Sequence, residues 1–310
     1  MSNTDSESRK APGERGSAGG RLRRPGGDAG RGGERPLLIV DGDSFAHRYF
    51  HAPFGSVKRA DGSDGKLLDG VGSLLIRLWQ EEQPRAVLVA WDTLTVPTYR
   101  HTALPAYQSG REFAPALLEQ LDLAPQLVEA MGFVPAKADG YEADDFLAAG
   151  VAFETERGGS ALVASGDRDT FQLVSERTTV LQPQVGGGPL ARIGPDEVRE
   201  RYGVEPAQVP DFIALRGDPS DKIPGARGVG AKTAASLLGQ YGTLEAALEQ
   251  GRFAAEADDL RLFRHVATMD REAPLPPLDD QQPTWEKAAV LARDWGLERL
   301  AGRLEALSSS

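Results

Sequence analysis

The sequence predicts an α/β fold in which a mainly parallel sheet is flanked by helices and followed by a small helical domain. Three observations predict it. Short continuous apolar runs, typical of strands buried on both faces, alternate with segments of helical periodicity. Each of the first three runs ends at or shortly before an aspartate. After about residue 195 the apolar runs give way to helix starts led by Pro195 and Pro206.

The expected elements follow from these patterns in chain order. The apolar runs predict strands at 37–40, 86–91, 161–164 and 179–181. Apolar residues at helical spacing predict a helix between the first two strands, at Val71, Leu74, Leu75 and Leu78. The polar stretch near 98–125 is interrupted by prolines, and we expect a mobile helical insertion there, with helix continuing through 127–131.

Four parts are expected along the chain: a disordered tail at 1–35, an α/β domain at 36–195, a helical domain at 196–270 and a C-terminal extension at 271–310. The tail is rich in Gly, Ser, Arg and Pro, and its few large apolar groups cannot offset the entropy of ordering. We interpret it as a solvated segment; weak contact with nucleic acid is the alternative.

The charge of the chain argues at first against a nucleic-acid partner. The net charge is −11, and because residues 1–35 carry +3 the remainder carries −14. A protein that grips DNA by charge alone would be basic. No segment has the apolar length of a membrane helix or the pattern of a signal peptide, and the lack of cysteine excludes disulfides and thiolate metal sites.

Nine acidic residues account for much of the negative charge. They follow strand ends or occupy short motifs, at Asp41, Asp92, Glu142, Asp144, Asp145, Asp167, Asp169, Asp218 and Asp221. The carboxyl ends of parallel strands share one edge of a sheet, so carboxylates distant in sequence converge there. Converged carboxylates repel one another unless cations offset them, and oxygen ligands select Mg²⁺ or Mn²⁺. Two such ions about 4 Å apart would suit phosphodiester hydrolysis.

Each acidic group also has an ordinary structural explanation when it is taken alone. Asp41 could form a turn, Glu142 and Asp144 could stabilise a helix N-terminus, and Asp218 could cap a helix. We favour one shared site because all of the groups recur together in positions that a parallel sheet would bring to one edge.

A glycine-rich turn follows the last two acidic residues. Gly228 and Gly230 permit a tight hairpin, and the chain has helical character from Ala231 onward. Backbone amides at such a helix start, together with Arg227 and Lys232, would bind the sugar-phosphate backbone without reading bases. An ordinary glycine turn between helices is the alternative.

Together these segments resemble the 5′-nuclease family of flap endonucleases and the 5′–3′ exonuclease domain of bacterial DNA polymerase I. The resemblance covers about residues 37–270, in family order. The matching segments are Val40-Asp41-Gly42 with Arg48, Trp91-Asp92, Gly140-Tyr141-Glu142-Ala143-Asp144-Asp145, Gly166-Asp167-Arg168-Asp169 with Gln172-Leu173, and Gly217-Asp218-Pro219-Ser220-Asp221 with Gly228-Val229-Gly230-Ala231-Lys232-Thr233-Ala234.

The resemblance implies a PIN-like (resolvase-like) nuclease domain with a helical arch near 98–125 and a helix–three-turn–helix domain. It implies two Mg²⁺ or Mn²⁺ ions held by the nine acidic residues, and K⁺ at the glycine turn. We expect one metal subsite at Asp41, Asp92, Glu142 and Asp144, the other at Asp167, Asp169, Asp218 and Asp221, and Asp145 between them. The expected catalytic residues are Asp145, Asp167, Arg48 and Arg111. The expected DNA contacts are Arg48, Arg100, Tyr107 (stacking on a base), Arg111, Arg227, Gly228, Gly230, Lys232 and Thr233.

Two positions depart from the family pattern. The family's arch motif Tyr-Lys-x-x-Arg reads Tyr107-Gln108-Ser109-Gly110-Arg111, so a glutamine replaces the lysine that aids charge stabilisation at the scissile phosphate. Loss of one such group costs about 10²-fold in rate unless another cation, such as Arg100 or Arg111, substitutes. Lys222 stands where the family usually has Asn, and it could lie near phosphate or simply be exposed.

We expect a stand-alone, monomeric enzyme that hydrolyses DNA near 5′ ends, at flaps or nicks, without base-sequence specificity. It would act in replication and repair beside a separate DNA polymerase, in the cytoplasm at the nucleoid and with no membrane contact. Two alternatives stay open. One is a DNA-structure-binding protein with weakened catalysis, supported by Gln108; the other is an RNA-directed PIN-type nuclease, which would lack the glycine-turn module.

Overall fold

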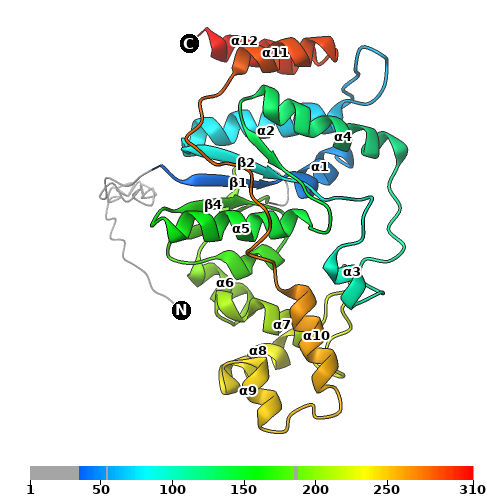
Figure 1. The fold of residues 1–310 in the computed structure, drawn as a ribbon, viewed down its shortest axis with the longest axis vertical. Coiled ribbons are helices and arrows are strands. Elements are labelled where there is room, and N and C mark those ends of the chain that lie inside the picture. The colour runs from blue at the N-terminus through cyan, green and yellow to red at the C-terminus, as the bar shows by residue number, and fades with distance from the viewer. Residues whose placement is uncertain (1–34, 54, 185–187, 310) are drawn as a thin grey trace, which may run out of the picture. The chain divides into compact units, whose positions relative to one another are not determined.

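A single sheet of six strands lies at the centre of the residues that the structure describes (Figure 1). The computed structural model describes residues 35–53, 55–184 and 188–309. The strands are β1 Leu37–Asp41, β2 Ala86–Ala90, β3 Val134–Ala136, β4 Ala161–Ala164, β5 Thr178–Gln182 and β6 Ala191–Ile193. Their order in the sheet is β3-β2-β1-β4-β5-β6, and every neighbouring pair is parallel except β5 with β6.

Helices cover both faces of this sheet, and the helices between residues 195 and 267 extend the core beyond β6. In chain order they are α1 Gly42–Phe50, α2 Lys66–Glu82, α3 Tyr99–Ala103, α4 Pro115–Ala130, α5 Ala143–Glu156, α6 Pro195–Tyr202, α7 Val209–Arg216, α8 Ala231–Tyr241, α9 Leu244–Glu249, α10 Ala257–Ala267, α11 Trp285–Asp294 and α12 Glu298–Ser308, with short 3₁₀ helices η1 Asp169–Leu173 and η2 Pro206–Gln208. No described helix is both long and apolar enough to cross a bilayer.

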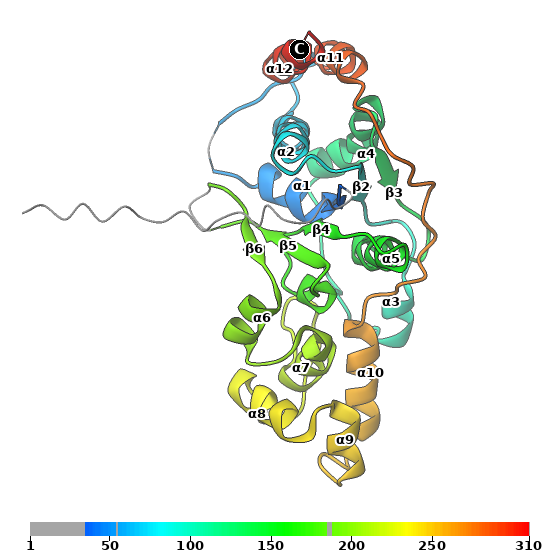
Figure 2. The same cartoon turned by 90° about the vertical axis from the view of Figure 1, so that its left-hand side faces the viewer.

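The alternation of side chains along β1 builds two cores on opposite faces of the sheet. Leu38 and Val40 pack with α1, α2 and α4, whereas Leu37 and Ile39 pack with α5. Figure 2 shows these helices on the two sides of the sheet. Every residue of β1, β2 and β4 is buried, because both faces of the central strands are covered by helices.

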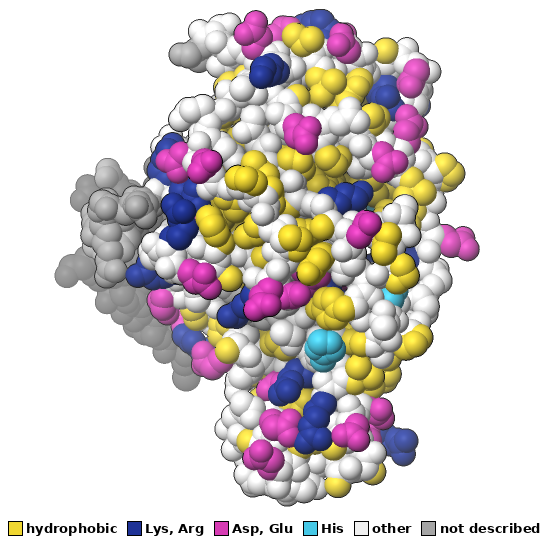
Figure 3. Space-filling model, in the orientation of Figure 1, with side chains coloured by type: hydrophobic (Ala, Val, Ile, Leu, Met, Phe, Trp, Pro, Cys, Tyr) yellow, Lys and Arg dark blue, Asp and Glu magenta, His cyan; other side chains and the backbone are white. Residues whose placement is uncertain are grey.

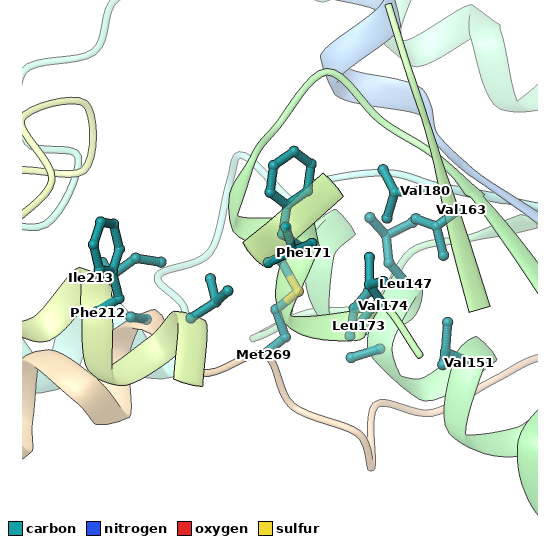
Figure 4. Close-up of a cluster of buried hydrophobic side chains, with 14 of the residues drawn as sticks. Leu147, Val151, Val163, Phe171, Leu173, Val174, Val180, Phe212, Ile213 and Met269 are labelled. Carbon is teal, nitrogen blue, oxygen red and sulfur yellow. The ribbon is translucent and has the colours of Figure 1, made fainter. Parts of the chain in front are cut away.

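The helices from α6 to α10 continue the core that lies on the α5 face. Phe171 of η1 and Met269 lie between side chains of the sheet layer, such as Val180, and Phe212 of α7 (Figure 4). The chain from residue 34 onward therefore forms one compact unit. The boundaries expected at 195 and 270 stay an interpretation.

The segment after α10 returns along the sheet and ends in α11 and α12. The amide of Val87 donates to Gln281 Oε1 at 2.8 Å, and Arg85 donates to the carbonyl of Leu278 at 2.9 Å. α11 contacts α4, and α12 contacts α2. The C-terminal extension thus covers the outer side of α2 and α4. On the face seen in Figure 3, acidic and basic side chains are interspersed.

The predicted fold class is confirmed, and the four predicted strands correspond to β1, β2, β4 and β5. Strands β3 and β6 escape the sequence patterns because each has three residues, and β3 contains Pro135, which only an edge strand tolerates. The helix expected from Pro206 begins as η2 before α7. Of the tail expected at 1–35, residues 1–34 lie outside the described residues.

Candidate active site

A cleft lies at the carboxyl edge of the sheet, where the strand order reverses between β1 and β4. The connections from these two strands leave in opposite directions, and such a switch point opens a crevice for ligands. Asp41 ends β1, Asp92 follows β2, and Asp167 follows β4. The cleft has a volume of about 1090 Å³. The acidic residues of its lining are Asp41, Asp43, Asp92, Glu142, Asp144, Asp167, Asp169, Asp218 and Asp221.

Asp41 is fixed at the floor of the cleft by two serines. Its Oδ1 caps α1 by accepting from the amide of Ser44 at 2.9 Å, and its Oδ2 accepts from Ser165 Oγ at 2.6 Å. The side chain is buried, and burial raises the pKa of Asp41 to about 7, with further contributions from the charges of Asp167 and Asp92. A nearby cation would therefore favour the ionised form strongly.

Asp43 belongs to the same wall of the cleft, although it is not among the nine predicted residues. Its Oδ2 accepts from the amide of Asp92 at 2.6 Å, and Asp92 Oδ1 accepts from the amide of Ala143 at 2.7 Å. Burial and the charge of Asp92 raise the pKa of Asp43 well above its usual range. The sequence signal that could have found Asp43 is its spacing, two residues after Asp41.

Glu142 and Asp144 enter the cleft from the start of α5. Glu142 Oε1 accepts from Thr98 Oγ1 at 2.9 Å, and its Oε2 accepts from the hydroxyl of Tyr107 at 3.0 Å. Burial raises the pKa of Asp144 well above its usual range, and the charges of Asp167 and Asp41 raise it further. The helix start thus presents two carboxylates to the centre of the cleft.

Asp145 does not line the cleft, which corrects its expected place between two metals. It is fully buried, and its oxygens accept from Arg100 at 2.7 and 2.8 Å and from the amides of Glu142 and Asp270 at 3.0 and 2.9 Å. Arg100 is equally enclosed, since its Nε donates to the carbonyl of Val266 at 3.0 Å. Both residues hold the fold together, so Arg100 is not available to DNA as expected.

Tyr107 also differs from its expected role of stacking on a base. Its side chain is buried and donates to Glu142, so the ring offers no face to a ligand. Gln108 Nε2 donates to the hydroxyl of Tyr107 at 2.9 Å and to Asp221 Oδ1 at 3.0 Å. The glutamine thus orders polar groups of the cleft but carries no charge.

Asp167 and Asp169 form part of the opposite wall, just after β4. The amide of Asp169 donates to Asp167 Oδ1 at 2.9 Å, and the amide of Asp167 donates to Ser165 Oγ at 2.9 Å. Burial raises the pKa of Asp169 well above its usual range, helped by the charges of Asp167, Asp221 and Asp218. The same serine therefore connects Asp41 on β1 with Asp167 after β4.

Asp218 and Asp221 complete this wall from the loop after α7. Asp218 accepts from the amide of Ser220 at 2.8 Å and from Arg216 at 2.9 Å. Burial and the charge of Asp167 raise the pKa of Asp221 to about 6, although Gln108 donates to the carboxylate. The loop brings these two acids to the residues that follow β4.

The donor chemistry of the cleft fits a hard divalent cation. Eight of the nine predicted acidic residues line it and supply only oxygen, and burial together with their mutual charge raises the pKa of Asp41, Asp144 and Asp169. As placed, no three acidic or histidine side chains in the described part of the chain converge closely enough to hold an ion. The cleft thus gathers the ligands without a preformed coordination shell.

The cations of the cleft differ in part from the predicted set. Arg111 lines it and donates to Asp221 Oδ1 at 3.1 Å. Arg48 is outside the lining: it is exposed and donates to the carbonyl of Gln184 at 3.2 Å. Arg168 and Arg216 line the cleft instead, and were not predicted. Their nearness in sequence to predicted acidic residues is the signal that could have found them.

The glycine hairpin before α8 presents open backbone to solvent. Gly228 has a φ of +75°, and an added Cβ there or at Gly230 would meet no other atom within 4 Å. Lys232 and Thr233 are exposed on the first turn of α8, and Arg227 is exposed beside them. The geometry suits contact with a backbone anion, and both the predicted DNA contacts and the predicted K⁺ stay predictions.

Comparison with known proteins gives matches along most of the chain. Residues 36–203 match the model described as 5′-3′ exonuclease, N-terminal resolvase-like domain, and residues 204–288 match that described as 5′-3′ exonuclease, C-terminal SAM fold. Over 267 residues the chain is 36% identical to DNA polymerase I of Mycobacterium leprae. The aligned region makes up 85% of this chain and 29% of that polymerase. The chain therefore spans less than a third of this relative's length.

Solved structures share the fold at low sequence identity. The bacteriophage T5 5′-exonuclease with bound divalent metal ions (zinc) aligns with a TM-score of 0.62 and 19% identity, over 88% of this chain and 99% of that chain. A bacteriophage T5 flap endonuclease with DNA and metal ions aligns with a TM-score of 0.62 and 18% identity, over 89% of this chain and 100% of that chain. At such identities the likeness concerns the fold alone.

Proposed function

Because this chain belongs to the 5′-3′ exonuclease family, we propose that it hydrolyses DNA phosphodiester bonds near 5′ ends, at flaps or nicks, in replication and repair. The observation that carries the proposal is the cleft at the sheet's switch point. Eight predicted carboxylates, drawn from five separate segments of the chain, line it. So many like charges in one cleft would destabilise a protein that had no cation to place among them.

The proposed cofactors are two divalent ions, Mg²⁺ or Mn²⁺. The residues that would hold them are Asp41, Asp92, Glu142 and Asp144 on one side and Asp167, Asp169, Asp218 and Asp221 on the other, with Asp43 as an added ligand or support for Asp92. Bound there, such ions supply an activated water and offset the charge of the phosphate being cleaved. The metal ions in the bacteriophage T5 structures support this proposal.

The chain's own contribution is to hold these carboxylates and the DNA in place. Ser44 and Ser165 fix Asp41, and Ser165 also reaches the backbone at Asp167. The exposed amides of the glycine hairpin, with Lys232, would grip duplex backbone without reading bases. Within the cleft, Arg111 would meet the phosphates of the strand to be cut.

A second candidate function is binding of DNA structures with weakened catalysis. Gln108 favours it, because its amide is neutral and already engaged with Asp221 and Tyr107. The RNA-directed alternative is less favoured, because residues 204–288 match the C-terminal domain of the 5′-3′ exonuclease family.

One assay separates these functions. Purified protein is incubated with labelled 5′-flap DNA, nicked duplex DNA and single-stranded RNA, in Mg²⁺ or in EDTA, and binding is measured in parallel. Release of short 5′ products from DNA in Mg²⁺ alone is the expected result. Binding of flap DNA without cleavage in Mg²⁺ or Mn²⁺ would favour the DNA-structure-binding protein. Preferential cleavage of RNA would favour the RNA-directed nuclease.

A DNA polymerase is the partner we propose, because the relative that this chain matches is a DNA polymerase I. Action as a monomer, and a location with the DNA of the nucleoid, belong to the same proposal; gel filtration with light scattering tests the first.

A further inference from the structure

The dipeptide Asp221-Lys222 connects the loop after α7 to segment 107–111. The amide of Gln108 donates to the carbonyl of Asp221 at 3.3 Å, and Gln108 Nε2 donates to its Oδ1 at 3.0 Å. The ammonium of Lys222 donates to the carbonyl of Ser109 and, at 3.0 Å, to Ser109 Oγ. Two consecutive residues of the loop therefore support this segment of the cleft wall.

Lys222 keeps this position in an unfavourable backbone conformation. Its φ is +58°, in the left-handed region that glycine and asparagine adopt more readily than lysine. Residues in such conformations persist where the surrounding structure holds them, and they concentrate at functional sites. The conformation explains why asparagine suits this position in the family pattern, but it does not explain a lysine. What lysine adds over asparagine at this position is the positive charge of its side chain.

The segment that Lys222 contacts lines two neighbouring cavities. Gln108 and Arg111 line the main cleft, and Ser109 and Gly110 join them in lining a neighbouring cavity of about 370 Å³. A Cβ added at Gly110 would lie 3.8 Å from the ammonium of Lys222. A strand that passes along this segment would meet the ammonium where position 108 offers only a neutral amide.

The ammonium of Lys222 has capacity left for an anion. An ammonium group has three donors, whereas Ser109 supplies two acceptors, and the Lys222 side chain is exposed. Arg111, the other cation of the segment, already donates to Asp221. Arg111 lines both cavities, and Lys222 adds a second positive charge beside them through its contact with Ser109.

We propose that Lys222 supplies, from the loop of the helical part, the phosphate-contacting positive charge that position 108 lacks. The inference rests on the proposed function and deepens it, because it names a residue that contacts the substrate. The ammonium crosses to segment 107–111, is oriented there by Ser109, and binds a backbone phosphate of the strand that enters the cleft. Lys222 therefore takes over the task that the family assigns to the arch lysine.

The test compares variants that keep the backbone conformation. Lys222→Asn removes the charge with a residue that tolerates a left-handed φ, so the variant folds. Lys222→Arg keeps the charge, and Gln108→Lys is combined with Lys222→Asn to restore a charge from the other side. Lys287→Gln, an exposed lysine on α11, is the matched control. Each protein is assayed for binding of 5′-flap DNA in Ca²⁺ at several salt concentrations, and for single-turnover cleavage in Mg²⁺.

For Lys222→Asn we expect the slope of log affinity against log salt to fall by about one, the value for one phosphate contact. Single-turnover cleavage should fall by about 10- to 10²-fold, as for loss of one charge-stabilising donor. Lys222→Arg and the double variant should recover most of both losses, and Lys287→Gln should lose nothing. If Lys222 only held segment 107–111 in place, its loss would lower the rate without changing the salt slope. Gln108→Lys would then not restore the rate.

The outcomes keep this inference apart from the proposed function. If the natural protein cleaves DNA and Lys222→Asn keeps its rate and salt slope, the role of Lys222 is overturned and the nuclease stands. If the natural protein binds but never cleaves, and the slope still depends on Lys222, the phosphate contact stands and hydrolysis is overturned. If the protein does not bind flap DNA at all, both are overturned.

Discussion

Arg100 and Asp145 form a bidentate ion pair, at 2.7 and 2.8 Å, that is 3% and 0% exposed. It connects α3 to the first turn of α5, and Asp145 also accepts from the amide of Asp270. Nothing of this carboxylate is left for the cleft. The neighbouring Asp144 lines the cleft, whereas Asp145, which we expected between the two metal subsites, does not.

We expect Asp145→Asn to destabilise the fold by about 3–5 kcal/mol, because it leaves the buried guanidinium of Arg100 with only its longer ion pair to Glu142, at 3.4 Å. Urea unfolding measures the change. Asp196→Asn, which breaks an exposed pair with Arg199, is the matched control and should change stability by less than about 1 kcal/mol. An Asp145→Asn protein of natural stability that had lost metal binding would return this residue to the metal site.

The raised pKa values of the cleft carboxylates predict how stability depends on pH. Asp41, at about 7 against an ordinary 3.8, and Asp221, at about 6, bind protons more tightly in the folded than in the unfolded chain. Their contribution to stability is therefore present at low pH and is lost as pH rises from about 4 to about 7. We expect the metal-free protein to lose thermal stability over this range through these groups.

Divalent cations should reverse this trend, because they require ionised ligands. Mg²⁺ should raise the melting temperature more at pH 8 than at pH 5, and its apparent affinity should rise through pH 6–7. Thermal unfolding at constant ionic strength, with and without Mg²⁺, measures both effects. Asp41→Asn should flatten the metal-free pH dependence; an unchanged slope in that variant would contradict the pKa assigned to Asp41.

Gly228 tests the proposed grip on the DNA backbone. Its φ is +75°, so Gly228→Ala introduces backbone strain and a methyl group at the exposed hairpin. Gly158→Ala is a close control, because Gly158 has a φ of +82° and equally open surroundings after α5. We expect similar losses of stability in both variants, but weaker duplex binding only in Gly228→Ala, by a similar factor for unrelated sequences. Equal DNA affinity of the two variants would remove the hairpin from the DNA contact.

Tyr107 tests whether the arch segment acts through packing or through contact with a base. Tyr107→Phe loses the hydrogen bond to Glu142 and should lower stability by about 1.5–3 kcal/mol, as for a buried bond to a charged group. Affinity for flap DNA in EDTA should not change, because the ring is 3% exposed. If folded Tyr107→Leu lost DNA affinity while Tyr107→Phe kept it, a stacking role would replace this assignment.

The features that the sequence predicts well are those with a local signal. Strands such as β1 are covered on both faces, so they appear as unbroken apolar runs, and the strand-end rule then brings Asp41, Asp92 and Asp167 to one edge. Short edge strands carry no such signal. β3 and β6 are stabilised by pairing with β2 and β5, partners that a three-residue pattern does not reveal.

The sequence does not predict which of two adjacent acidic residues in a motif faces the cleft. Asp144 and Asp145 are neighbours on α5, and consecutive helical residues point in directions about 100° apart, so one faces the cleft and the other the interior. Which of the two does so depends on Arg100, 45 residues earlier in the chain. The burial of Tyr107 has no local signal for the same reason, because its partner Glu142 is also distant in sequence.

The central claim is that the cleft carboxylates hold divalent ions that drive hydrolysis of DNA. Single-turnover cleavage of labelled 5′-flap DNA by Asp167→Asn tests it most directly, beside Asp122→Asn, an exposed residue of α4, as control. We predict Mg²⁺-dependent cleavage by the natural protein and the control, and a loss of at least about 10²-fold in Asp167→Asn with flap-DNA binding retained. Natural rates in Asp167→Asn, or undiminished cleavage in EDTA, would contradict the account.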